Sequence, residues 1–153
     1  PAKTALRFFG AETLYKSLRR SDPTPTLFDY VVTMLERLDL TRDQTSSYPI
    51  EFLIGLSQHL GIQRMDNHSL ANPYFSIVEG RFQPQSPGTP QLDETMSQQL
   101  HQYLHAVEHS ALMPTLPLPE RQRLLRALID YYQAHLAEFK NFKSHEILHS
   151  VLQ

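Results

Sequence analysis

The chain lacks cysteine and long apolar runs, and both absences limit what it can be. None of its 153 residues is a cysteine, so disulfide bonds and thiolate metal sites are excluded. No apolar run approaches the roughly 20 residues that a membrane-spanning helix needs, and no secretory signal opens the sequence. We therefore expect no membrane contact and favour a cytoplasmic protein.

Familiar catalytic motifs are also missing. The sequence has no glycine-rich phosphate loop, no Gly-x-Ser-x-Gly elbow and no His-Glu-x-x-His motif. The adjacent carboxylates of Asp93 and Glu94 suit the start of a helix better than acid–base catalysis. We expect a binding protein without a cofactor, not an enzyme.

Charge is modest in total and uneven along the chain. The formal net charge is −2, but residues 1–20 hold five basic residues against one acid, a local balance of +4. Residues 21–62 hold six acids against two arginines. This is not the composition of a strongly basic nucleic-acid-binding domain, so phosphate contacts are expected only at local patches or outside this segment.

Hydrophobic spacing predicts an all-α domain of about six helices, a single domain over residues 1–153. The longest pattern begins near Glu120, after Pro119, which suits a first helical turn. Its stripe breaks near Asn141, and Ser144 can cap a short closing helix. Apolar residues recur along it at helical spacing and are expected to form the centre of the core: Leu125, Leu128, Ile129, Tyr132, Leu136 and Phe139.

Four more helices are expected at residues 3–20, 25–38, 48–60 and 93–107. Proline at 25, glycine at 61 and aspartate at 93 mark their ends. On the first three, the faces expected to point inward are Leu6, Phe9, Leu14 and Leu18; Leu27, Phe28, Val31, Val32, Leu35 and Leu38; and Phe52, Leu53, Leu56 and Leu60. On the fourth they are Met96, Leu100, Tyr103, Leu104 and Val107.

Residues 63–90 interrupt the helical pattern. Four prolines and two glycines fall in this stretch, too many for a helix. Residues 74–77 and 81–83 favour two short strands joined around Gly80. We expect this insertion to hold its shape without metal, through apolar side chains packed on the helices: Tyr74, Phe75, Ile77 and Phe82.

Three histidines repeat every fourth residue in the fourth helix. His101, His105 and His109 share one face, a spacing that can hold a metal through two imidazoles. No further ligand is implied, so we favour exposed or edge-packed histidines. A histidine-dependent metal hydrolase is the weaker alternative.

Arg121, Arg123 and Arg126 fall in the first two turns of the longest helix. Solvation of a surface is the simplest interpretation. The alternative is an anion site, because exposed N–H groups and the helix dipole favour negative charge at this end. Beside Leu118 and Leu124, the arginines would form an apolar pocket rimmed with positive charge, which would suit an acidic peptide that ends in an aromatic residue and a free carboxylate. The aromatic residue would enter a neighbouring apolar groove lined by Tyr48 and Phe52.

Several stretches resemble the RecO family of bacterial DNA-repair proteins. The run from Leu124 to Leu148 is similar to the C-terminal end of that family, with Lys143 and Ser144 at its closing Lys-Ser. Residues 11–18 (AETLYKSL) and 52–62 (FLIGLSQHLGI) resemble two of its helices, and residues 75–82 its aromatic-Glu-Gly-x-Phe segment. The resemblance covers nearly the whole chain and is closest to the Bacteroidetes branch.

The resemblance implies a recombination mediator of the RecFOR-type pathway. Its helical C-terminal domain would bind the acidic tail of single-stranded DNA-binding protein. A preceding OB-fold, absent from this chain, would carry most contacts with RecR and with single- and double-stranded DNA in the nucleoid. Many relatives carry a four-cysteine zinc module in the insertion, and this sequence has none of those cysteines. Candidate phosphate contacts are Arg19, Arg20, Lys140 and Lys143. The alternative is a generic helical adaptor.

Overall fold

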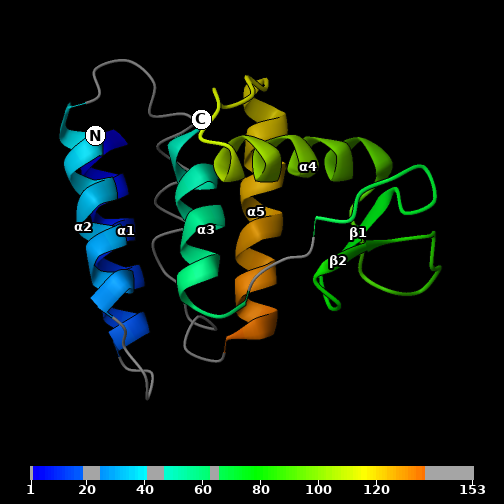
Figure 1. Ribbon diagram of the computed structural model, residues 1–153, viewed down its shortest axis with the longest axis horizontal. Coiled ribbons are helices and arrows are strands. Elements are labelled where there is room, and N and C mark those ends of the chain that lie inside the picture. Colours follow the sequence, from blue (N-terminus) through cyan, green and yellow to red (C-terminus); the bar gives the residue numbers. More distant parts are fainter. Residues whose placement is uncertain (1, 19–24, 41–46, 63–65, 137–153) are drawn as a thin grey trace.

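The computed structural model describes residues 2–18, 25–40, 47–62 and 66–136. Within these ranges the chain forms five helices and one two-stranded antiparallel sheet (Figure 1). The elements are α1 (Ala2–Leu18), α2 (Pro25–Leu40), α3 (Tyr48–His59), β1 (Tyr74–Ser76), β2 (Arg81–Gln83), α4 (Glu94–Glu108) and α5 (Leu118–His135). The predicted helical architecture with one small hairpin is confirmed for this part, and the expected sixth helix lies outside the described residues.

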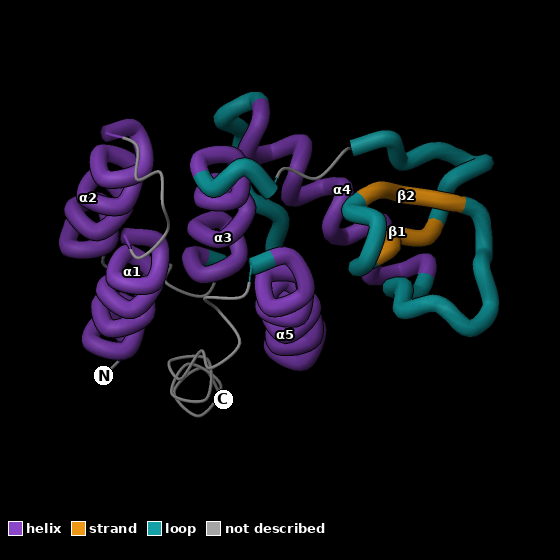
Figure 2. Tube along the Cα trace, turned by 90° about the horizontal axis from the view of Figure 1, so that it is seen from below, coloured by secondary structure: helices purple, strands orange, loops and turns teal. Residues whose placement is uncertain are grey.

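Four helices lie side by side and the fifth crosses them. In Figure 1, α1, α2, α3 and α5 run along nearly the same direction, while α4 lies across α3 and α5 with the hairpin at its N-terminal end. The tube in Figure 2 shows α1 packed beside α2, and α3 between α2 and α5. The core therefore forms where α3 meets its three neighbours.

Helix α3 is the most buried element. Its residues are predominantly apolar, and the expected inward set of Phe52, Leu53, Leu56 and Leu60 is confirmed, each at most 4% exposed. The helix ends at His59 with Leu60 as its C-cap, and Gly61 follows with a φ of +73°, the left-handed conformation that glycine adopts most easily. The N–H of Ile62 then donates to the carbonyl of Ser57 at 3.1 Å, which completes the predicted C-terminal cap.

Helix α2 packs largely through the predicted face: Leu27, Val31 and Leu38 are buried and Val32 and Leu35 are half-buried, but Met34 takes the place of Phe28. Leu27, Val31, Met34 and Leu38 follow each other at helical spacing and are at most 5% exposed. Phe28, expected to point inward, is 51% exposed, because it lies about 100° around the helix from Leu27.

The hairpin is anchored by two facing phenylalanines. Phe75 pairs with Phe82 across the strands, their rings meet edge to face at 5.1 Å, and both side chains are at most 2% exposed. Gly80, with φ of +70°, makes the turn and donates its N–H to Ser76 at 2.9 Å. The side-chain amide of Asn67 donates to and accepts from the backbone of Phe82, each at 2.8 Å.

Helix α5 is shorter than the sequence predicted. It begins at Leu118 with Pro119 in its first turn, as expected, but ends at His135 instead of near Asn141. Leu136 adopts extended backbone angles (φ −134°, ψ 115°), while its N–H still bonds the carbonyl of Tyr132 at 2.8 Å. The Leu136 side chain is only 5% exposed, so the chain is still packed on the core one residue past the end of the helix.

Candidate functional site

A groove of about 590 Å³ opens between α5, the start of α4 and the end of the hairpin. One face of α5 forms its long wall, and residues from the hairpin and the N-terminal part of α4 form the other. Its lining residues are Ile77, Leu92, Met96, Pro119, Gln122, Arg123, Arg126, Ala127 and Asp130. Its volume is in the range typical of small-molecule sites.

Local hydrogen bonds hold the apolar wall of the groove in place. The N–H of Leu92 donates to the carbonyl of Phe75 at 2.9 Å, and the N–H of Met96 donates to the capping carboxylate of Asp93 at 2.7 Å. On the other side, Nε2 of His135 donates to the carbonyl of Ile77 at 2.9 Å. The hairpin and α4 are thus fixed relative to α5, which leaves the groove already formed.

The charged residues of the groove all come from α5. Arg123 is exposed, and the Arg126 side chain is 65% exposed. Arg126 Nε lies 3.5 Å from Oδ1 of Asp130, one turn further along the helix. Because the N-terminal end of α5 also carries the positive end of the helix dipole, the groove favours anions near Arg123.

The other predicted site residues lie elsewhere. Arg121 donates from Nη1 to the carbonyl of Leu116 at 3.1 Å and does not line the groove. Tyr48 and Phe52 are 5% and 0% exposed, so they belong to the core and leave no surface for a ligand. The arginines and the two aromatic residues therefore do not form the single groove expected from the sequence.

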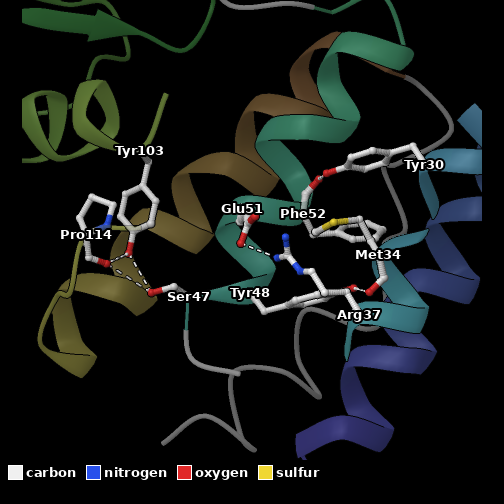
Figure 3. A network of polar contacts seen from close by, with 9 residues as sticks. All are labelled: Tyr30, Met34, Arg37, Ser47, Tyr48, Glu51, Phe52, Tyr103 and Pro114. Carbon is white, nitrogen blue, oxygen red and sulfur yellow. Dashed lines mark hydrogen bonds and ion pairs between the residues drawn. The ribbon is translucent and has the colours of Figure 1, made fainter. Parts of the chain in front are cut away.

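Tyr48 and Phe52 belong instead to a polar network that joins α2 to α3 (Figure 3). The Tyr48 hydroxyl donates to the carbonyl of Met34 at 2.5 Å, and the Tyr30 hydroxyl donates to the carbonyl of Phe52 at 3.1 Å. Burial raises the pKa of Tyr30, which keeps its hydroxyl protonated as a donor. An Arg37–Glu51 ion pair of 2.6 Å lies beside them.

The same figure shows how α4 joins this network (Figure 3). The Tyr103 hydroxyl donates to the carbonyl of Pro114 at 3.0 Å and lies 3.2 Å from the hydroxyl of Ser47. Burial raises the pKa of Tyr103 as well. These contacts position α2, α3 and α4 relative to one another.

The histidines on α4 are placed as side-chain contacts. His101 Nδ1 lies 2.7 Å from Oδ1 of Asp66, and its ring stacks on His68 at 4.6 Å. His105 and His109 are exposed and stack on each other at 4.1 Å. Across the described ranges, no three His, Asp or Glu side chains gather as a metal site. The metal-hydrolase alternative therefore gains no support from this part of the chain.

Some expectations fall outside the described residues. Arg19, Arg20, Lys140 and Lys143, the candidate phosphate contacts, are among them. Of the helices that the structure describes, none has the length and apolar character needed to span a bilayer.

The fold and groove define a helical domain with a preformed apolar site flanked by arginines, an arrangement suited to binding peptides. Residues 1–146 match the family described as "Recombination protein O C terminal". The chain belongs to this family, which confirms the resemblance seen in the sequence. It is thus a C-terminal domain of the recombination protein O type.

Named relatives agree with that assignment. The chain is 28% identical to "DNA repair protein RecO" of Azobacteroides pseudotrichonymphae, covering 99% of this chain and 63% of the relative. It is 30% identical to the protein of that name in Flavobacterium psychrophilum and 32% identical to that in Flavobacterium johnsoniae, covering 97% of this chain and 61% of each relative. The chain therefore spans less than two thirds of these relatives. No solved structure matches it significantly.

Proposed function

We propose that this domain serves a bacterial recombination mediator by binding the acidic C-terminal tail of single-stranded DNA-binding protein in the α5 groove. The observation that carries the proposal is an apolar groove with two arginines, Arg123 and Arg126, on its α5 wall. Membership of the RecO family supports the repair context.

The chemistry of such a tail complements the groove. Its aspartates and terminal carboxylate would form charge-assisted hydrogen bonds with the two guanidinium groups. Its terminal phenylalanine would be buried among Ile77, Leu92 and Met96. Burial of one aromatic side chain contributes about 1.5–3 kcal/mol, so ring and charges together support binding.

The other partners of the pathway belong to the same proposal. RecR and single- and double-stranded DNA would be bound mostly by a part of the protein that precedes this chain. Arg19, Arg20, Lys140 and Lys143 would add phosphate contacts. The protein would act in the cytoplasm, at the nucleoid, as a binding protein and not an enzyme.

Titration of a peptide ending Asp-Ile-Pro-Phe, and of its C-terminal amide, tests the proposal. We expect Arg123→Ala or Arg126→Ala to weaken binding of the free acid about ten-fold, because a good charge-assisted hydrogen bond contributes roughly 1.5–3 kcal/mol. Arg81→Ala, an exposed arginine of β2 outside the groove, is the matched control. Added salt should weaken binding of the acid, because screening acts over about 10 Å at 0.1 M.

The place of binding can be read from methionine methyl groups by NMR. Met96 lines the groove, whereas Met34 and Met113 lie together at a different cleft, beside Tyr30 and Arg37. We expect the Met96 signal to shift on addition of the peptide while the other two stay in place. A generic helical adaptor would not need the terminal carboxylate. Equal affinity for acid and amide, unchanged by Arg121→Ala, Arg123→Ala and Arg126→Ala, would contradict the proposed site.

A further inference from the structure

The groove contains a carboxylate where an acidic ligand would bind. Of the residues that line it, Arg123, Arg126 and Asp130 are charged, and Asp130 is the acid among them. Its side chain is 45% exposed and its Oδ1 lies 3.5 Å from Nε of Arg126. Asp130 therefore holds one of the two guanidinium groups that an anionic ligand needs.

We propose that Asp130 is a specificity-determining residue, an internal competitor that a ligand's carboxylate must displace from Arg126. The inference rests on the proposed function, because it concerns the same groove and the same class of acidic peptide. An exposed ion pair one helical turn apart is weak, about 0.3–0.5 kcal/mol, so a peptide carboxylate bound with additional apolar contacts can replace it.

This competition favours one orientation of a bound ligand along α5. Arg123 lies two turns closer to the N-terminus of α5 than Asp130, so the positive charge is least compensated at that end. At the other end, Ile77 is held by His135, in the last turn of α5 and therefore on the side of Asp130 away from Arg123. A ligand with acidic residues toward Arg123 and an apolar residue toward Ile77 matches this distribution of charge along the groove. The reverse orientation places its acids beside Asp130.

Asp130→Asn removes the competing charge and keeps the shape of the side chain. We expect the Asp-Ile-Pro-Phe acid to bind this variant roughly two-fold more tightly than the wild type, the change in affinity that an exposed ion pair of this strength accounts for. The gain should disappear in the Arg126→Ala background, because the competition acts through that guanidinium. Glu36→Gln, which removes an exposed carboxylate from α2, is the control for net charge.

The outcomes separate this inference from the proposed function. Tight binding that depends on Arg123 and Arg126 but is not improved by Asp130→Asn would overturn the competitor role and leave the groove as the site. An equal gain from Glu36→Gln, or a gain that persists without Arg126, would also overturn it. Binding by neither the wild type nor Asp130→Asn, with both folded by thermal melting, would refute both proposals.

Discussion

Phe82→Ala tests whether apolar packing holds the hairpin on the helices. The Phe82 side chain is 1% exposed and meets the rings of Phe75 at 5.1 Å and His68 at 5.2 Å. Truncating a buried phenylalanine costs about 3–5 kcal/mol, because the transfer free energy and the contacts around the cavity are lost together. A domain of this size is stable by about 5–15 kcal/mol, so the helices should stay folded while the hairpin opens.

Hydrogen–deuterium exchange reports on the hairpin and the helices separately, and circular dichroism reports on the helical content. We expect rapid exchange over residues 67–83, retained protection in α3 and α5, and a helical signal close to that of the wild type at room temperature. Phe28→Ala, the same change at a side chain that is 51% exposed, should alter stability by about 0.5 kcal/mol or less. Loss of the helical signal in Phe82→Ala, or recovery of its stability on addition of zinc, would show the reasoning to be wrong.

Two further substitutions test local features. Ser110 has a positive φ of 51° at the C-terminal end of α4, so Ser110→Gly should stabilise the domain by about 1 kcal/mol and raise its melting temperature by roughly 2–4 °C; a lower melting temperature would contradict this. Asn67→Ala removes both side-chain hydrogen bonds to the Phe82 backbone and should cost about 1–3 kcal/mol, seen as faster exchange of the Phe82 amide. Asn72→Ala, which removes an exposed side-chain hydrogen bond to Ser69, is the control, and equal exchange in both variants would refute the role of Asn67.

Elements with a local boundary signal were predictable from the sequence. Gly61 follows the C-cap of α3, Gly80 turns the hairpin and Asp93 caps α4, and each acts through its own backbone or side chain. The end of α5 carries no such signal, because neither glycine nor proline follows His135, and Leu136 turns to extended angles while its side chain stays buried. The C-terminal end of α4 carries no glycine signal either. Ser110 takes the left-handed conformation there, which the sequence does not indicate.

The sequence predicted the arginines of the groove but not its apolar wall. Arg123 and Arg126 stood out because charge at a helix start has a local meaning. Ile77 was assigned to the insertion and Met96 to the fourth helix, but their meeting with Leu92 beside α5 depends on packing between segments far apart in the chain. Tyr48 and Phe52 were misplaced for the same reason, because an apolar residue next to a polar network looks no different in sequence from one that lines a groove.

The side chain of Asn67 has a consequence for how partners can approach the hairpin. A two-stranded sheet has two outer edges, and an open edge can accept a strand from another chain. Here the backbone of Phe82 on β2 is already satisfied by Asn67, and β1 is bridged to Gln91 at Ser76. A peptide therefore finds no free backbone at these positions for strand addition, so recognition beside the hairpin must depend on side chains. The same covering guards against edge-to-edge association of two copies.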